Sequence, residues 1–364
     1  MTLILLYILA ALFIILTIYY WGVFSKFAFS KSQETNPKRL PVSVIVYARN
    51  NENDLRTIIP ILLNQNYHQF ELVIVNNAST DETLTLIKEY ALLYPNIKVV
   101  DVINNETFWG NKKYALTLGV KASKYEYLVF VDANTKIVSA NWLVQLTSHF
   151  TINKTIIISV NYYTKTKGFF NRFLRFDHVI QQMQSLSWSK ISKPYSLNLQ
   201  TIALKKEEFY KVNGFIQHMQ KPFFTNEYFL HDAALVKNTI ICEHEVAKNE
   251  INPLSSFKEL FSFKKHQLQL LKDLNFGIRF KIKSFYFFQF LFNVTVIATI
   301  CLLDFWYVGV ALLFLKIFTS WYLFAKTSQK LNSKDLIWWY PILNIVYLIF
   351  QFQLFLKNLT IKRT

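Results

Sequence analysis

Residues 125–135 read YEYLVFVDANT, a β-branched and aromatic run that ends in Asp132, Ala133 and Asn134. A continuous apolar run of this kind is typical of a buried parallel strand, and the polar residues then fall at its carboxyl end. Open α/β sheets bind their ligands at that edge. We therefore expect Asp132 and Asn134 to face a binding site.

Two earlier runs have the same form, residues 41–54, PVSVIVYARNNEND, and residues 70–83, FELVIVNNASTDET. Each places sheet-forming residues before a polar segment and a helical pattern, which is the strand, loop and helix order of a doubly wound α/β sheet. The polar segments should therefore converge on one edge of the sheet.

The same patterns predict a further strand at residues 97–102 and helices at residues 53–64, 80–93 and 112–123. Ser79 and Glu82 have the spacing of a capping box at the start of the second helix. The α/β pattern is regular up to residue 142 and looser from there to residue 252.

The chain has 364 residues, of which 52% are hydrophobic, and a mean hydropathy of +0.20. An ordinary soluble domain of this length is less apolar. No charge interrupts residues 3–24, a length that crosses a hydrocarbon core of roughly 30 Å. We interpret residues 1–25 as an N-terminal transmembrane anchor. A cleaved signal peptide is the less favoured alternative, because no basic segment precedes the run and no small-residue cleavage site follows it.

The C-terminal region, residues 285–357, is the second apolar part of the chain, and we expect two to three spans in it. Its candidate spans are residues 285–303, 305–324 and 336–356, which makes four spans the favoured total. With four spans, the basic tail of the chain would end outside the cell. A re-entrant or interfacial final segment is therefore the alternative.

Basic residues directly after the first span predict the orientation of the chain. These residues are Lys26, Lys31, Lys38 and Arg39. The positive-inside rule then places the central domain in the cytoplasm. We expect an integral membrane protein, located in the inner membrane of a bacterial cell.

The formal net charge of +17 suits attraction to anionic lipids and to a phosphorylated substrate. Basic residues alternate with Leu, Phe and Ile in residues 264–283, so residues 256–284 are predicted to form a basic amphipathic segment at the membrane surface. Nucleic-acid binding is disfavoured, since no nucleic-acid motif accompanies these charges. The chain has 2 cysteines, 7 glycines and no glycine-rich phosphate loop, which argues against a structural disulfide and against ATPases and nicotinamide enzymes.

Oxygen donors two residues apart at a strand end suit a hard divalent cation, which would bridge nucleotide phosphates. Asp132 and Asn134 are such a pair, although a turn or a helix cap explains them equally well. In residues 76–81, NNASTD, several side chains could bind a ribose or a base, and a capped turn is again the alternative. Lys112 and Lys113 open a predicted helix, and the helix dipole does not stabilise cations at that end. Their presence there is explained either by a phosphate partner or by exposure to solvent.

Together, PVSVIVYARNNENDL, ELVIVNNASTDET, GNKKYAL and YLVFVDANTKIVSANWL, in this order and spacing, resemble family-2 glycosyltransferases with a GT-A fold. The similarity is strong over residues 41–150 and weaker over residues 198–280. It implies a Rossmann-like GT-A domain at residues 40–255, flanked by transmembrane helices. Membrane-anchored members of this family transfer a sugar from a nucleotide-diphosphate donor, usually with inversion. The resemblance therefore implies a nucleotide-sugar donor, a lipid-linked or glycan acceptor, contact with membrane lipids, and Mg2+ or Mn2+ as cofactor.

Carried over by position, the resemblance assigns roles to individual residues. Those assigned to the nucleotide are Ala48, Arg49, Asn50, Asn77, Lys112, Lys113 and Asp132, with the choice between the two lysines open. Asp132 and Asn134 take the metal and ribose roles. After an Asn-Gly-Phe segment, here residues 213–215, the family places an acidic base that deprotonates the acceptor hydroxyl. Glu227 is the nearest candidate for this catalytic base, and Asp232 is the second.

The chain departs from the family pattern at two of these positions. The family has Asp where Asn77 and Asn134 stand here, and an amide oxygen can bind a cation without adding negative charge. Metal affinity should therefore be weakened. The family's membrane-proximal motif is represented only by residues 263–267, FKKHQ, in which Lys265 or His266 either meets a diphosphate or belongs to the basic amphipathic helix.

These observations lead to two main hypotheses. The first is a membrane-anchored, hexosyltransferase-type glycosyltransferase that acts at the cytoplasmic face. The second is a GT-A scaffold or subunit with impaired catalysis that works beside an active transferase, as the altered motif positions suggest. A transporter is a weaker third hypothesis, because the spans carry only Asp304 and Lys316 as charged candidates and no evident pathway. The sequence specifies neither the sugar, nor the nucleotide, nor the acceptor.

Overall fold

The computed structural model describes residues 2–33, 35–103, 111–302 and 305–361. The chain forms two compact units. The helical unit consists of Met1–Ser30, Lys165–Ile191 and Leu254–Thr364, and the sheet unit consists of Lys31–Thr164 and Ser192–Pro253. Each unit therefore combines segments that are far apart in the sequence.

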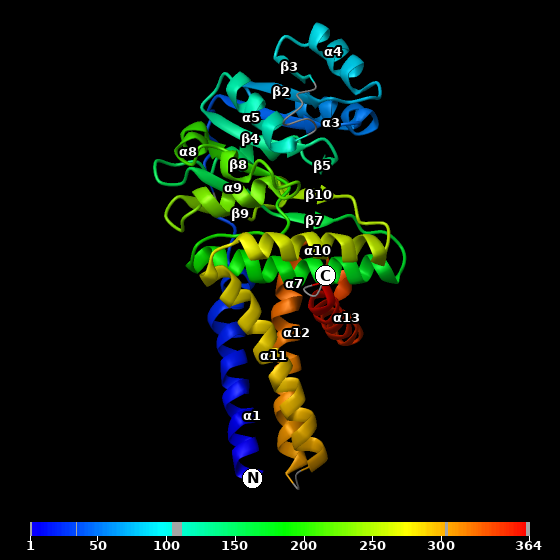
Figure 1. Cartoon of the computed structure of the whole chain (residues 1–364). Coiled ribbons are helices and arrows are strands. Elements are labelled where there is room, and N and C mark those ends of the chain that lie inside the picture. Colours follow the sequence, from blue (N-terminus) through cyan, green and yellow to red (C-terminus); the bar gives the residue numbers. More distant parts are fainter. Residues whose placement is uncertain (1, 34, 104–110, 303–304, 362–364) are drawn as a thin grey trace. The chain divides into compact units, whose positions relative to one another are not determined.

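The sheet unit contains a seven-stranded sheet with the strand order β3-β2-β1-β4-β8-β6-β9 (Figure 1). Its strands are β1 (Val42–Ala48), β2 (Phe70–Asn77), β3 (Ile97–Val102), β4 (Tyr127–Asp132), β6 (Ile156–Ser159), β8 (Ile202–Lys205) and β9 (Thr239–Cys242). The strands β3, β2, β1 and β4 run parallel to one another, whereas β8 is antiparallel to both β4 and β6. A second sheet has the order β5-β10-β7, formed by β5 (Thr135–Ile137), β10 (Asn249–Ile251) and β7 (Asn161–Tyr163).

Helices follow the parallel strands, as the order of a doubly wound sheet requires. The helices of the sheet unit are α3 (Glu52–Leu63), α4 (Thr83–Leu93), α5 (Lys112–Ala122), α6 (Trp142–Thr147), α8 (Lys206–Lys211) and α9 (Thr225–Ala233), with short 3-10 turns η2 (Ile216–His218) and η3 (Glu245–Ala247). The parallel strands are buried over most of their length, because helices must cover both faces of such a sheet. The α/β class that the sequence predicts is confirmed.

The start of α4 differs from the expectation. Ser79 does not cap this helix, which begins at Thr83 after the N-cap residue Glu82. The Ser79 hydroxyl instead accepts a hydrogen bond of 3.0 Å from the Asn50 amide, and the Asn50 side chain accepts one of 2.8 Å from the Thr80 amide. The expected capping box is wrong because the loop after β2 bonds to the loop after β1, a long-range contact that local spacing does not reveal.

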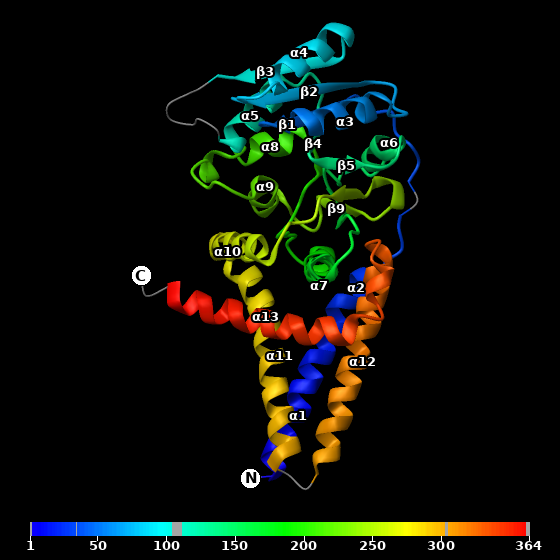
Figure 2. The same cartoon turned by 90° about the vertical axis from the view of Figure 1, so that its right-hand side faces the viewer.

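The helical unit is formed by α1 (Thr2–Thr17), the π-helix η1 (Ile18–Phe24), α2 (Ser25–Ala28), α7 (Phe169–Ile191), α10 (Phe257–Asp273), α11 (Phe276–Leu302), α12 (Trp306–Lys330), η4 (Lys334–Leu336) and α13 (Tyr340–Ile361). Among its described residues, three segments are long and apolar enough to cross a membrane: Leu3–Ala28, Phe276–Leu302 and Trp306–Lys330. The helices α1, α11 and α12 run side by side (Figures 1 and 2). Outward-facing apolar side chains along them suit contact with lipid rather than water.

The last candidate span of the sequence, residues 336–356, falls on η4 and α13. Figure 2 shows α13 lying across α1, α11 and α12 instead of alongside them. It packs against α7, where the rings of Phe173 and Phe350 are 5.2 Å apart, and against α11, where the hydroxyls of Tyr286 and Tyr347 are 3.0 Å apart. This direction differs from that of the three long apolar segments, and it fits the interfacial alternative better than a fourth span.

Gly119 of α5 provides a test of this packing. A Cβ atom at this position would lie 2.8 Å from Val75 Cγ2 and 2.9 Å from Ile45 Cγ2, both on buried strands. Gly119→Ala should therefore lower the free energy of unfolding by about 1–3 kcal/mol through overpacking. Thr117→Ala, on a half-buried turn of the same helix, should change it by only about 0.5 kcal/mol. Thermal unfolding of the full chain in detergent measures both, and equal midpoints would contradict the expected packing.

Candidate active site

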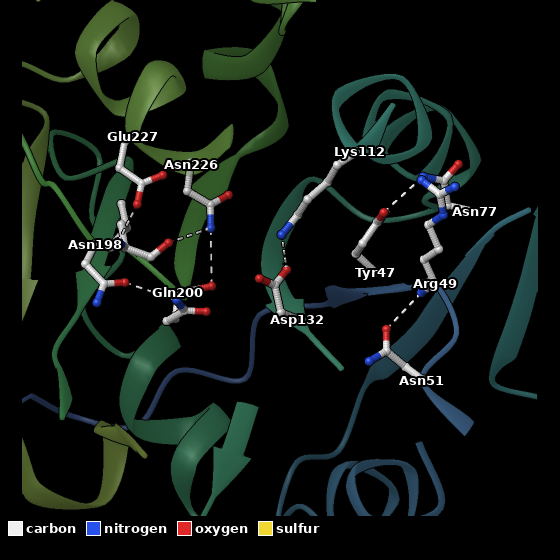
Figure 3. Close-up of polar contacts among 11 residues, drawn as sticks. Tyr47, Arg49, Asn51, Asn77, Lys112, Asp132, Asn198, Gln200, Asn226 and Glu227 are labelled. Carbon is white, nitrogen blue, oxygen red and sulfur yellow. Dashed lines mark hydrogen bonds and ion pairs between the residues drawn. The ribbon is translucent and has the colours of Figure 1, made fainter. Parts of the chain in front are cut away.

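Polar side chains gather at the carboxyl edge of the parallel strands. In the two ladders of β1, Ala48 lies opposite Asn76 of β2, and Tyr47 lies opposite Asp132 of β4. The polar segments that follow these strands therefore start at the same level. Figure 3 shows Tyr47, Asn77 and Asp132 on this edge. The register of β1 with β2 and β4 thus produces the convergence of polar segments that the sequence predicts.

Lys112 and Asp132 form an ion pair at this edge. The Lys112 Nζ atom lies 2.5 Å from Asp132 Oδ1 and 4.9 Å from the centre of the Tyr47 ring. Lys112 is held there because it opens α5, whose N-cap residue Asn111 accepts a hydrogen bond of 2.8 Å from the Lys113 amide. Both charged side chains are about a quarter exposed, at 26% and 24%, so the pair is accessible to a ligand.

Asn77 presents an unused hydrogen-bond acceptor. Its Nδ2 atom donates to the Tyr47 hydroxyl at 3.0 Å, while its Oδ1 atom is buried and has no hydrogen-bond partner among the residues that the structure describes. A buried polar atom without a partner is costly, and a bound ligand is one way to satisfy it. Figure 3 places the Arg49 side chain beside Asn77. The backbone of Asn50 adopts a positive φ of 53°, which turns the chain sharply after β1.

Glu227 of α9 is buried next to the segment that leads into β8. Its Oε1 atom accepts a hydrogen bond of 2.6 Å from the Leu199 amide. Burial raises the pKa of Glu227 to about 7, although the hydrogen bond from Leu199 and the charge of Lys112 act in the opposite direction. A carboxyl group with such a pKa can accept a proton near neutral pH. Its neighbour Asn226 donates to the carbonyl groups of Leu199 and Gln200, at 3.1 and 3.2 Å, and so fixes the same segment (Figure 3).

Asp232 has a different environment from Glu227. Its Oδ2 atom lies 2.8 Å from His218 Nε2 and its Oδ1 atom lies 3.0 Å from His231 Nδ1. Burial raises the pKa of Asp232, but the hydrogen bonds from the two imidazoles outweigh burial and hold the pKa well below its usual range. A carboxylate with so low a pKa is a weak base. Of the two acidic candidates, Glu227 has the surroundings that better suit proton uptake, and its role as base stays a prediction.

Lys113 does not share the surroundings of Lys112. Its side chain is 1% exposed, and its Nζ atom donates to the carbonyl groups of Lys221 and Phe223 at 2.5 and 3.0 Å. Burial lowers its pKa to about 8, while the nearby Glu227 charge acts to raise it. Lys113 thus ties α5 to the segment before α9, in which Phe224 adopts a left-handed φ of 60°. Of the two lysines that the sequence leaves open, Lys112 is the one that is presented at the strand edge.

The donors for a metal are few. Asp132 is bonded to Lys112, and Asn134 is exposed in the turn between β4 and β5. No group of three or more His, Cys, Asp or Glu side chains that could hold a metal ion is found in residues 2–33, 35–103, 111–302 and 305–361. One carboxylate and one amide oxygen suit a hard cation that takes most of its ligands from a diphosphate and water. The donor set therefore fits Mg2+ or Mn2+ only together with a phosphorylated ligand.

The membrane-proximal candidates lie in the helical unit. Lys264 of α10 is buried and donates to Asp177 of α7 at 2.6 Å, so this lysine is already neutralised. Lys265 is exposed, and the Nδ1 atom of His266 lies 3.3 Å from the Oε1 atom of Gln269 on the same helix. A role of Lys265 or His266 toward a diphosphate stays a prediction.

Four residues of this site carried no sequence signal that we used. Tyr47 holds Asn77 and lies under Lys112. Leu199 and His218 bond to the carboxylates of Glu227 and Asp232, and Asn226 bonds to the carbonyl groups of Leu199 and Gln200. A tyrosine one residue before the end of a buried strand could have indicated Tyr47. The others are visible only once α9 packs beside the segment at residues 198–200.

The chain is similar to known glycosyltransferases over part of its length. Residues 43–220 match the model of glycosyl transferase family 2. The uncharacterized glycosyltransferase YibD of Escherichia coli strain K12 is 29% identical over 96 residues, which are 26% of each protein. The poly-beta-1,6-N-acetyl-D-glucosamine synthase of Staphylococcus epidermidis is 29% identical over 96 residues, or 26% of this chain and 22% of the synthase. The chain thus matches about a quarter of the length of these relatives.

A solved structure shares the fold. The mannosyltransferase PcManGT of Pyrobaculum calidifontis, solved in complex with GDP-Man and Mn2+, has a TM-score of 0.57. The match covers 96% of this chain and 99% of that one, at 16% identity. At this identity, the similarity shows a common architecture.

The environment of Glu227 predicts how stability depends on pH. Its pKa is about 7 in the folded chain against an ordinary 4.5, so the folded state holds the proton more tightly than the unfolded chain. The resulting stabilisation is complete below pH 4.5 and is lost as the pH rises to about 7. Glu227→Gln should therefore raise the free energy of unfolding at pH 9 by roughly 3 kcal/mol and leave it nearly unchanged at pH 4. Unfolding midpoints over this pH range provide the measurement, and a parallel offset at all pH values would contradict the raised pKa.

Proposed function

Since the chain carries a family 2 glycosyl transferase domain of the GT-A fold, we propose that it transfers a sugar from a nucleotide-diphosphate donor to a hydroxyl group of a lipid-linked or other membrane-associated glycan. The grouping of Lys112, Asp132 and Glu227 is the observation that carries the proposal. The charges of Lys112 and Asp132 both act on the pKa of Glu227, so the three groups lie within electrostatic reach of one another. This edge offers a cation for a diphosphate and a base for a hydroxyl group.

The nucleotide would lie across the ends of β1 and β2. The buried Asn77 Oδ1 atom would accept an N–H group of the base beside the Arg49 side chain, and Ala48 and Asn50, the chain neighbours of Arg49, would contact the nucleotide with it. The diphosphate takes Lys112 as its basic contact, and Asp132 is then free to bind the ribose or a cation. Lys112 can move between these partners because its pair with Asp132 is partly exposed.

Asp132 and Asn134 would hold the divalent cation. Bound there, Mg2+ or Mn2+ would supply positive charge at the diphosphate leaving group. The solved mannosyltransferase that shares the fold binds GDP-Man and Mn2+. An amide in place of the second carboxylate lowers the charge of the site, so the affinity for the cation should be modest.

Transfer would proceed by a single in-line displacement. The acceptor hydroxyl oxygen forms a bond to the anomeric carbon while the bond from that carbon to the phosphate oxygen breaks, which inverts the configuration. The hydroxyl proton passes to Glu227, and the nucleoside diphosphate leaves with the bonding electron pair. Lys112 stabilises the charge that develops on the leaving group, which is a differential effect on the transition state.

The charge distribution around three spans supports a cytoplasmic sheet unit. Lys26 lies in the last turn of the first span, Arg279, Lys281 and Lys283 lie near the start of α11, and Lys326 and Lys330 lie near the end of α12. No Lys or Arg lies in residues 303–305 between α11 and α12. With three spans, all these basic residues fall on one side of the membrane, which is the cytoplasmic side by the positive-inside rule.

A scaffold with impaired catalysis is the second candidate function. Asn77 and Asn134 motivate it, because both replace carboxylates of the family pattern. Nucleotide binding alone would be compatible with either function, so turnover has to separate them.

Binding of nucleotides tests the donor site. Titration calorimetry of the detergent-solubilised chain should show that UDP or GDP binds in the presence of Mn2+. Asp132→Ala should weaken this binding about tenfold or more, because a charged ligand of the site is lost. Glu126→Ala is the matched control, since Glu126 is exposed near the opposite end of β4. Binding of neither nucleotide by the wild-type chain would contradict the proposal.

Restoring the family carboxylates tests turnover. The double variant Asn77→Asp, Asn134→Asp should bind Mn2+ more tightly than the wild type because it adds two negative charges near the nucleotide. If the wild type is an enzyme, release of nucleoside diphosphate is measurable in both proteins and is lost in Glu227→Gln. Turnover that appears only in the restored variant would instead favour the scaffold.

A further inference from the structure

The segment between α8 and α9 leads directly into the helix that carries Glu227. Its last residue, Phe224, is the N-cap of α9 and has φ 60° and ψ 57°, in the left-handed region. Glu227 lies three residues later, in the first turn of the helix, and extends with Asn226 toward residues 198–200 (Figure 3). The backbone conformation of Phe224 therefore sets how the chain enters α9 and where the proposed base lies.

The left-handed conformation of Phe224 is strained. A positive φ brings the Cβ atom of an L residue too close to the following carbonyl oxygen, and bulky residues rarely adopt it. Five non-glycine residues of the described ranges have a positive φ, and three of these are Asn, which tolerates it best. Phe224 is the largest of the five, and its side chain makes no capping hydrogen bond to α9. Contacts from elsewhere must therefore hold this turn.

Two residues at the start of α5 supply such contacts. The Lys113 Nζ atom donates hydrogen bonds to the carbonyl groups of Lys221 and Phe223, at 2.5 and 3.0 Å. The Asn111 Nδ2 atom donates to the carbonyl group of Met219. The carbonyl groups of three alternate residues before Phe224 are thus bonded to side chains of α5. We call Asn111 and Lys113 the α5 clamp.

Both residues of the α5 clamp are themselves held in place. The Asn111 Oδ1 atom accepts hydrogen bonds from the amides of Lys113 and Tyr114, at 2.8 and 3.4 Å, which fixes the orientation of its amide group. The Lys113 side chain is buried, and its Nζ atom lies 5.4 Å from the centre of the Tyr228 ring of α9. A buried ammonium group has lost its water, so it depends on the carbonyl groups that it binds. The α5 clamp therefore joins α5 both to the segment before α9 and to α9 itself.

The α5 clamp also lies next to the proposed donor site. Lys112 stands between the two clamp residues in the sequence and bonds to Asp132 at 2.5 Å. Three successive residues at the start of α5 thus contact both the strand edge and the segment that leads to the base. A nucleotide could use the Lys113 ammonium group only by breaking its bonds to the carbonyl groups. Its surroundings therefore suit a role toward α9 better than a role toward the donor.

We propose that Lys113 is a positioning residue of the transfer reaction, which holds the left-handed turn at Phe224 and thereby keeps Glu227 in place to take the proton of the acceptor hydroxyl. This role rests on the proposed function, because it requires Glu227 to be the base. Lys113 acts through the carbonyl groups of Lys221 and Phe223 and not through contact with the donor. A shift of about 1 Å in a catalytic group can lower a rate about 100-fold, so a residue that only positions the base can control turnover.

Hydrogen–deuterium exchange of the full chain in detergent, without substrate, tests whether Lys113 holds the turn. Lys113→Met should raise the exchange rate of the amides in Thr225–Ala233 about tenfold or more, because the turn before α9 is released. Adding Phe224→Gly should restore slow exchange, since glycine adopts a positive φ without strain. Adding Phe224→Ala should not restore it, because alanine lacks the same ring but keeps the Cβ atom.

Kinetics tests the consequence for transfer. In Lys113→Met, the rate of nucleoside diphosphate release in the turnover assay should fall about tenfold or more, while the Kd of UDP or GDP with Mn2+ stays within about twofold of the wild type. Adding Phe224→Gly should restore the rate, and adding Phe224→Ala should not. A nucleotide contact by Lys113 would instead raise the Kd, and an effect of its charge on Glu227 would not be rescued by glycine.

Lys121→Met is the matched control, because it removes the same charge from an exposed position in the last turn of α5. It should resemble the wild type in exchange and in rate. If Lys113→Met does not fold, the milder variant Lys113→Gln should show the same pattern to a smaller extent.

Unchanged exchange in Lys113→Met, equal rescue by Phe224→Gly and Phe224→Ala, or a weakened nucleotide affinity would each overturn the proposal. Absence of turnover in the wild type would overturn the proposed function and with it the role of Lys113 in transfer. The exchange rates, which need no substrate, show separately whether Lys113 holds the turn at Phe224.

Discussion

The parallel pairing of β1 with both β2 and β4 is the constraint on which the site depends. Because side chains alternate along a strand, a slip of one residue in either ladder would exchange the side chains that pack on its two faces. Val44 and Val46 are buried on one face of β1 and Ile45 on the other, so packing on both faces fixes the register. The same register sets Asp132 opposite Tyr47 and Asn76 opposite Ala48. The polar edge is thus a consequence of packing several residues away from it.

The two units neutralise their buried charges in different ways. In the sheet unit, Lys113 is buried against main-chain carbonyl groups, and Glu227 is buried against a main-chain amide. Neither has a full counter-ion, so the pKa values of both move toward neutrality. In the helical unit, the Lys264–Asp177 pair joins α10 to α7, and such pairs contribute more to a unique arrangement than to net stability. Lys316 stands apart from both patterns, since it is buried without either kind of partner among the described residues.

Part of the site could be predicted from the sequence, whereas the rest depends on how distant segments pack in the tertiary structure. Asp132 and Asn77 could be predicted because they end buried strands, and parallel strands share an edge. The choice between Lys112 and Lys113 could not be made, because neighbours on a helix point about 100° apart and either can face the sheet edge. The roles suggested for Glu227 and Asp232 rested on resemblance. Their different surroundings, an amide for one and two imidazoles for the other, depend on contacts between distant segments.

The sequence by itself determined the α/β class, the four parallel strands, the apolar character of the two ends and the scarcity of charged residues in the spans. These properties depend on local periodicity and composition, which are read directly from the sequence. Only the tertiary structure decided that Ser79 bonds to the loop after β1, that α13 lies across the other long helices, and that Lys316 is buried. Each of these outcomes depends on which surfaces meet. The local sequence pattern around a residue determines its secondary-structure element. The residues that it contacts lie on other segments of the chain, and only folding brings these segments together.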